Sequence, residues 1–125
     1  MKYYIIAGES SGDLYGGKLI QEIRQLDDHA HIICWGGPKM KGYSDFQKKS
    51  LSDTAFMGFW EVAKNLPSIK RLFDFAKSDI IASHPDVLIL IDYPGFNLRM
   101  AKWAHTKGIK VVFYISPQLW AWKEK

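Results

Sequence analysis

The sequence predicts an α/β domain in which helices cover both faces of a Rossmann-like parallel sheet. Short apolar runs, which are the expected strands, alternate along the chain with stretches whose apolar residues recur at helical spacing. Turns rich in glycine or proline separate the two kinds of segment. The length of 125 residues suits a single domain over residues 1–125, without an internal repeat or a linker.

The first half of the chain predicts two strands and a long helix between them. The apolar run 3–7 is the first strand, and apolar residues at helical spacing from Tyr15 to Leu26 predict the helix that follows it. Residues 31–35 are the second strand, which ends at two glycines and a proline that lead into a short helical turn. Residues 43–55 are polar and predict a loop with at most one short strand.

The second half predicts two more strands, each preceded by a helix. Pro67 opens a long helix with one apolar stripe. The run 87–91 is apolar on both faces, which is typical of a strand covered by helices on each side, and it is the expected centre of the sheet. A helix over residues 97–107, closed by Gly108, leads to the last strand at 110–115.

Composition excludes several classes of protein. Apolar residues make up 47% of the chain and aromatic residues 14%, which argues against disorder. No window is apolar enough for a membrane span, and the first residues do not resemble a signal peptide, so a cytosolic protein is expected. The single cysteine, Cys34, lies in an apolar run and predicts a buried thiol. The four histidines lack metal-ligand spacing, so no metal is expected.

The net charge of +4 is unevenly distributed. Between Asp92 and Glu124 every charged residue is basic. This region is expected to attract phosphate groups or anionic lipid, unless it is an ordinary lysine-rich solvated face. No nucleic-acid partner is expected.

The turn GESSGD, residues 8–13, allows three interpretations. As a hydrolase elbow of the GxSxG type it would make Ser10 a nucleophile, but no histidine stands at a predicted strand end to serve as its base. As a ligand loop it could aim backbone N–H groups at a phosphate, although the GxGxxG spacing of dinucleotide folds is absent. As a simple strand-to-helix turn it would use Ser10 or Ser11 as the helix cap, with Asp13 favoured by the positive helix end.

Asp92 is the first charged residue after the buried run 87–91. A carboxylate at the mouth of such a strand can be held partly desolvated, and burial makes it a better proton acceptor while a nearby cation keeps it ionised. The other interpretation is that Asp92 only caps the next turn. Asn97 is expected to be a helix cap in either case.

Residues 56–77 carry more aromatic side chains than one helix stripe can bury, and lysines and an arginine lie among them. This composition suits a face that dips into a bilayer, with basic residues at its rim. It equally suits a hydrophobic core shared with other protein.

Residues 116–123 follow the last expected strand and hold two tryptophans beside a lysine. Tryptophan faces suit sugars and acyl chains, so this segment can form a wall of a binding site. Packing against a partner domain is the alternative.

Taken in order, these segments resemble lipid-A-disaccharide synthase, a glycosyltransferase family. The matching pieces are AGESSGD, GGPKM, MGFWEV, HPDVLILIDYPGFN and YISPQLWAWK, and the likeness runs from about residue 5 to residue 123. It implies a GT-B fold, in which two Rossmann-like domains face each other across a cleft. The chain would be the N-terminal, acceptor-side half, and the donor-binding C-terminal domain would be missing.

The resemblance also implies a reaction and a location. The family joins UDP-2,3-diacylglucosamine to 2,3-diacylglucosamine 1-phosphate (lipid X), releasing UDP with inversion at the donor carbon, and no metal or cofactor is implied. The protein would act at the anionic surface of the cytoplasmic membrane, on its inner face. The fragment alone is expected to be inactive because the donor-binding domain is missing.

The resemblance assigns roles to individual residues. Asp92 is the expected catalytic base. The expected substrate contacts are Gly8, Glu9, Ser11, Gly12, Asp13, Asn97, Trp120, Trp122 and Lys123. The expected contacts with acyl chains or the membrane are Met57, Phe59, Trp60 and Phe73.

Three positions depart from the family pattern. Gly95 stands where a second aspartate is frequent, Lys123 where arginine is usual, and Ser10 where alanine is more common. A lysine cannot make the bidentate phosphate contact of an arginine. The alternative functions are a non-catalytic module that binds acylated sugar phosphates or anionic lipid and, more remotely, a serine hydrolase with Ser10.

Overall fold

The sheet consists of five parallel strands in the order β3-β2-β1-β4-β5. The structure, a computed structural model, describes residues 1–54 and 67–115. The strands are β1 (Lys2–Ala7), β2 (His31–Gly36), β3 (Phe46–Ser50), β4 (Val87–Ile91) and β5 (Val111–Tyr114). Successive strands run outward from β1 in one direction as far as β3 and in the other from β4 to β5. The strand order therefore reverses between β1 and β4, where open α/β sheets bind their ligands.

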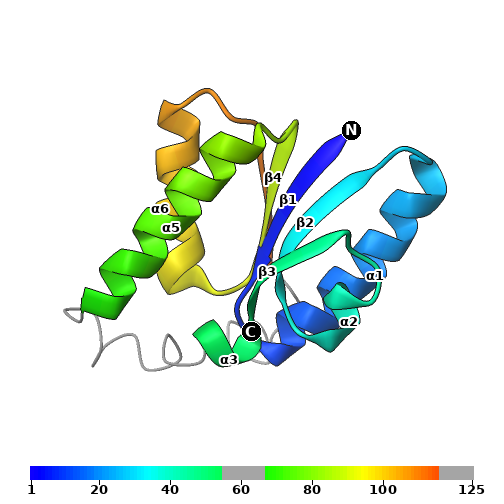
Figure 1. Cartoon of the computed structure of the whole chain (residues 1–125), viewed down its shortest axis with the longest axis horizontal. Coiled ribbons are helices and arrows are strands. Elements are labelled where there is room, and N and C mark those ends of the chain that lie inside the picture. The colour runs from blue at the N-terminus through cyan, green and yellow to red at the C-terminus, as the bar shows by residue number, and fades with distance from the viewer. Residues whose placement is uncertain (55–66, 116–125) are drawn as a thin grey trace, which may run out of the picture.

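Helices cover both faces of this sheet, as the sequence predicts. They are α1 (Ser10–Leu26), α2 (Pro38–Lys41), α3 (Leu51–Thr54), α5 (Pro67–Ser83) and α6 (Pro94–Thr106). In Figure 1, α5 and α6 lie on one side of the strands, and α1 and α2 lie on the other. The α/β fold class is confirmed.

Three details differ from the sequence predictions. The central strand is β1, since β4 is second from the end of the sheet, and hydropathy does not separate two neighbouring buried strands. Helix α6 begins at Pro94 with Tyr93 in the cap position, so Asn97 is not its cap. In α1 the cap position belongs to Glu9 without a side-chain cap bond, so neither Ser10 nor Ser11 caps the helix.

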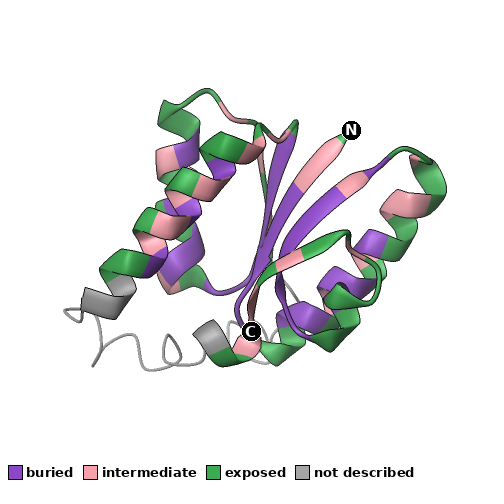
Figure 2. Cartoon of the chain, viewed as in Figure 1, coloured by how far each residue is buried: buried purple, intermediate pink, exposed green. Residues whose placement is uncertain are grey.

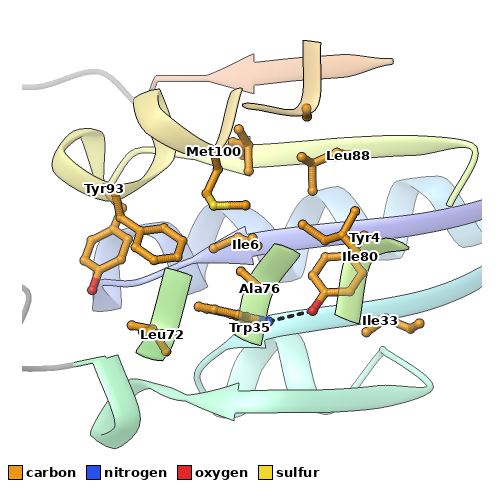
Figure 3. Close-up of a cluster of buried hydrophobic side chains, with 13 residues drawn as sticks. Tyr4, Ile6, Ile33, Trp35, Leu72, Ala76, Ile80, Leu88, Tyr93 and Met100 are labelled. Atoms are coloured by element: carbon orange, nitrogen blue, oxygen red, sulfur yellow. Dashed lines mark hydrogen bonds between the residues drawn. The ribbon is translucent and has the colours of Figure 1, made fainter. Parts of the chain in front are cut away.

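The core has two parts, one on each face of the sheet, and buried residues concentrate on the strands and the inward sides of the helices (Figure 2). The larger cluster fills the space between the sheet and helices α5 and α6 (Figure 3). Within it, Tyr4 Oη accepts a hydrogen bond from Trp35 Nε1 at 2.9 Å and donates one to Asp79 Oδ2 at 2.6 Å. On the opposite face Cys34 is a buried free thiol, as predicted, and burial raises its pKa.

Asp13 fastens the loop after β2 to helix α1. Its buried carboxylate accepts hydrogen bonds from the backbone N–H groups of Gly37 (2.9 Å), Lys39 (3.1 Å) and Met40 (2.9 Å). These groups belong to the cap and the first turn of α2, where N–H groups have no partner within the helix. The carboxylate thus supplies the acceptors that the N–H groups at the start of this four-residue helix lack within the helix itself.

We expect Tyr4→Phe to lower the free energy of unfolding by about 1–3 kcal/mol at pH 7, because it removes both bonds of the hydroxyl and leaves the Trp35 N–H without its partner. Burial, followed by the hydrogen bond to Asp79, raises the pKa of Tyr4 far above its ordinary value of 10.0. In the unfolded chain Tyr4 ionises near that ordinary value. The contribution of the Tyr4 hydroxyl to the free energy of unfolding is therefore complete below pH 10 and declines as the pH rises further.

The measurement is urea unfolding of the wild-type chain and Tyr4→Phe between pH 7 and pH 11. The stability difference should shrink above pH 10, by at most about 1.4 kcal/mol per pH unit. A difference that stays constant over the whole range would contradict the proposed linkage.

We expect Asp13→Ala to cost about 3 kcal/mol of stability, because it leaves two buried backbone N–H groups and a partly buried one without an acceptor. Asp13→Asn keeps one acceptor oxygen and should cost less. The exposed Asp28 provides the control, since Asp28→Ala should change stability by less than about 0.5 kcal/mol. Equal unfolding midpoints for Asp13→Ala and Asp28→Ala would refute the role of Asp13.

Candidate functional site

A pocket of about 370 Å³ lies at the carboxyl ends of β1, β4 and β5. It is lined by Glu9, Ser11, Asp92, Pro94, Leu98, Phe113 and Ile115. Polar side chains from the turn after β1 thus share one cavity with a carboxylate after β4 and with an apolar wall from α6 and the end of β5. Such a combination suits a ligand that has both a polar and an apolar part.

Asp92 is held firmly at this pocket. It directly follows β4, it is buried, and its backbone N–H donates a hydrogen bond to the carbonyl oxygen of Tyr114 at 2.9 Å. Its backbone is left-handed, with φ of 48°. A non-glycine residue adopts this conformation only where its surroundings impose it, and such residues concentrate at functional sites.

Asn97 joins the ends of the two strands that flank the site. It is completely buried in the first turn of α6. Its Nδ2 lies 3.2 Å from the carbonyl oxygen of Ile6, 3.3 Å from that of Ile91 and 2.9 Å from that of Asp92. The side-chain amide therefore holds β1, β4 and the peptide after Asp92 in one arrangement.

Tyr93 follows Asp92 and supports the site from the core without lining the pocket, and the sequence did not indicate this role. Its backbone is also left-handed, with φ of 55°, and its side chain is buried. The ring lies against the backbone of Gly8, so that a Cβ atom built on Gly8 would lie 2.4 Å from ring atoms of Tyr93. No sequence signal predicts this contact. Tyr93 precedes Pro94, and a residue before proline ordinarily prefers an extended backbone to the left-handed one observed here.

The remaining residues of the GESSGD turn separate into two groups. Glu9 and Ser11 line the pocket, and their expected role as substrate contacts stays a prediction. Gly12 is buried against the sheet, where an added Cβ would lie 3.1 Å from Ala7 Cβ. Asp13 accepts its hydrogen bonds from the loop after β2 and does not line this pocket, and its expected role as a substrate contact stays a prediction.

Of the residues expected to contact acyl chains or the membrane, Phe73 alone is among the described residues. Phe73 of α5 is half-buried; its ring stacks on that of Phe96 in α6, with ring centroids 4.4 Å apart, and packs against the larger core cluster. Its expected contact with acyl chains or the membrane stays a prediction. The other predicted residues, Met57, Phe59, Trp60, Trp120, Trp122 and Lys123, lie outside the described residues.

Ser10 has no histidine within reach to act as its base. His29 and His31 lie at the start of β2, His84 precedes β4, and His105 lies at the end of α6. All four are therefore at the amino ends of the strands, opposite the GESSGD turn. The hydrolase interpretation lacks its base.

Neither a metal-binding cluster nor a membrane-spanning helix occurs in the part of the chain that the structure describes. Within residues 1–54 and 67–115, no group of three or more histidine, cysteine or carboxylate side chains is placed to hold a metal ion. In the same part of the chain, no helix combines the length and the apolar character that crossing a bilayer requires.

Comparison with known proteins gives a consistent result. A family model described as lipid-A-disaccharide synthetase matches residues 3–125. The lipid-A-disaccharide synthase of Trichlorobacter lovleyi is 42% identical over 96% of this chain and 31% of its own length. That of Geobacter sulfurreducens is 42% identical over 95% of the chain and 31% of its own length. For Xanthomonas euvesicatoria the identity is 40% over 97% of the chain and 28% of the relative.

The chain thus spans less than a third of the length of these relatives. The match nevertheless includes every strand of the sheet and every residue that lines the pocket. The chain belongs to the lipid-A-disaccharide synthetase family.

Proposed function

We propose that this chain is the N-terminal, acceptor-side domain of a glycosyltransferase of lipid A biosynthesis. The reaction would join UDP-2,3-diacylglucosamine to 2,3-diacylglucosamine 1-phosphate and release UDP. Family membership supports the class of reaction, and the observation that carries the assignment of the site is the buried carboxylate of Asp92 in a pocket at the strand-order reversal. A separate donor-binding domain would complete the cleft.

Asp92 would act as the general base. It takes the proton of the acceptor hydroxyl while that oxygen forms a bond to the anomeric carbon of the donor. The bond between this carbon and the phosphate oxygen breaks on the opposite face, and UDP leaves with the bonding electrons. A single displacement of this kind inverts the anomeric carbon. It needs one base on the acceptor side and positive groups on the side of the departing UDP.

The rest of the pocket suits an acylated sugar. Glu9 and Ser11 line the pocket together with Asp92, which supports contacts between their side chains and sugar hydroxyls. Leu98 and Ile115 are largely exposed and form with Phe113 an apolar wall that an acyl chain can cover. Asn97 would not touch the substrate, because it is completely buried and bound to backbone carbonyls; it would instead orient the loop that carries Asp92.

Membrane association on the inner face of the cytoplasmic membrane is part of the proposal. Acylated substrates reside in a bilayer, and the basic residues between Asp92 and Glu124 suit an anionic surface. Met57, Phe59 and Trp60 would contribute apolar contacts, and Trp120, Trp122 and Lys123 would face the donor-binding domain. A non-catalytic module for acylated sugar phosphates is the alternative, which the apolar wall of the pocket also favours.

The base assignment is tested by Asp92→Asn in a chimaera. The matching 119 residues of the Geobacter sulfurreducens relative are replaced by the corresponding segment of this chain, and UDP release and disaccharide formation are measured with both substrates. We expect Asp92→Asn to lower kcat by about 10²–10⁴-fold, because the amide cannot accept the proton.

Asp86 provides a matched control, because it precedes β4 as Asp92 follows it and therefore lies at the opposite edge of the sheet. Asp86→Asn should leave kcat within about twofold of the unsubstituted chimaera. Equal rates for the Asp92→Asn and unsubstituted chimaeras would remove Asp92 as the base.

The chain by itself should form no disaccharide, because half of the proposed cleft is absent from it. The measurement incubates the purified chain with both substrates, with the chimaera as the positive control. Product formation by the chain alone would contradict the division into acceptor and donor domains. Binding to anionic vesicles in the absence of turnover by either protein would favour the non-catalytic module.

A further inference from the structure

Asp92 and Tyr93 are two successive non-glycine residues in the left-handed region, with φ of 48° and 55°. In this region the Cβ atom crowds the following carbonyl, so each residue is there against its own preference. The conformation persists only when surrounding contacts impose it. The contacts that hold these two residues therefore also decide where the Asp92 carboxylate points.

Backbone contacts account for part of this restraint. The Asp92 N–H donates to the carbonyl oxygen of Tyr114, and the Asp92 carbonyl oxygen accepts from Asn97 Nδ2. The Tyr93 carbonyl oxygen accepts from the N–H groups of Phe96 and Asn97 in the first turn of α6. These bonds fix the two ends of the segment.

The ring of Tyr93 supplies a further anchor. It is only 4% exposed and belongs to the core cluster between the sheet and α5 and α6 (Figure 3). One neighbour of the ring is Phe96, with centroids 5.7 Å apart. Another is the backbone of Gly8, whose missing side chain leaves the space that the ring occupies, since a Cβ there would lie 2.4 Å from Cδ2, Cε2 and Cζ.

We propose that Gly8 and Tyr93 form a positioning pair that directs the Asp92 carboxylate into the pocket. The inference rests on the proposed role of Asp92 as the base. In this account Gly8 is glycine because the tyrosine ring needs the space above its backbone, and Gly8 does not itself contact the substrate. Neither residue is a catalytic residue, since both act through Asp92.

Gly8→Ala in the chimaera provides the first test. The added methyl group pushes the Tyr93 ring out of its place and thereby turns Asp92, so kcat should fall about 100-fold while KM stays within about twofold. Gly42→Ala is the control, because an added Cβ there makes only ordinary contacts, the nearest at 3.6 Å, and should leave both constants unchanged.

The ring is tested by two substitutions of Tyr93. Tyr93→Phe keeps the ring and should retain kcat within about twofold, whereas Tyr93→Gly removes it and should lower kcat by at least about tenfold, although glycine tolerates the left-handed backbone. When Gly8→Ala is combined with Tyr93→Gly, the added methyl group no longer meets a ring. The fall in kcat of this double variant should therefore equal that of Tyr93→Gly alone. A fall equal to the product of the two single effects would overturn the pair.

Measuring Gly8→Ala also in the Asp92→Asn chimaera separates this inference from the base assignment. If Gly8→Ala acts through Asp92, it should lower the residual kcat of Asp92→Asn by less than about twofold. The same large loss in both backgrounds would overturn the positioning pair while leaving Asp92 as the base. An Asp92→Asn chimaera with normal kcat would instead overturn the base assignment, and the positioning role would fall with it.

The chain itself allows a test that needs no turnover. Carbon NMR at one fixed pH records the chemical shift of the Asp92 carboxyl carbon in the wild-type chain, Tyr93→Phe and Tyr93→Gly. The resonance should keep its position in Tyr93→Phe and should move in Tyr93→Gly, because loss of the ring changes the surroundings of the carboxylate. An unmoved resonance in Tyr93→Gly would overturn the proposal even if Gly8→Ala fails to fold.

Discussion

The side-chain amide of Asn97 joins the carboxyl ends of the two strands between which the strand order reverses. Its Nδ2 is shared by the carbonyl oxygens of Ile6 in β1, Ile91 in β4 and Asp92. Buried carbonyl groups need hydrogen-bond donors, and this one buried amide contacts carbonyl groups of both strands. It therefore fixes the end of β1, where the Gly8 turn begins, relative to the end of β4, where the Asp92 loop begins.

The pocket follows from this junction and from the topology of the sheet. Because all five strands are parallel, the loops after β1 and β4 and the carboxyl end of β5 lie at one edge of the sheet. The loop after β1 brings Glu9 and Ser11, the loop after β4 brings Asp92, and the end of β5 adds Phe113 and its neighbours. At the same edge, the loop after β2 is drawn toward α1 by the buried carboxylate of Asp13. Rigid elements thus place a carboxylate beside an apolar wall.

The sequence predicts those features that depend on residues adjacent in the chain, and it misses those that depend on which strands pair in the sheet. The strand at 87–91 was predictable because its apolar run is continuous, and with it the position of Asp92 at a strand end. The ring of Tyr93 on Gly8 was not, because these residues meet only when β1 and β4 lie side by side. Asp13 lies in the first turn of its own helix, as predicted, but its bonds to the start of α2 could not be predicted, because they depend on the pairing of β1 with β2.

The central claim is that the Asp92 carboxylate takes the proton of the acceptor sugar. A crystal structure of the intact enzyme with 2,3-diacylglucosamine 1-phosphate bound tests it most directly. The account predicts the attacking hydroxyl oxygen within about 2.6–3.2 Å of an Asp92 carboxylate oxygen, with an acyl chain along Leu98 and Phe113. An acceptor sugar bound elsewhere, with its attacking hydroxyl beside another base and Asp92 facing only solvent, would contradict it.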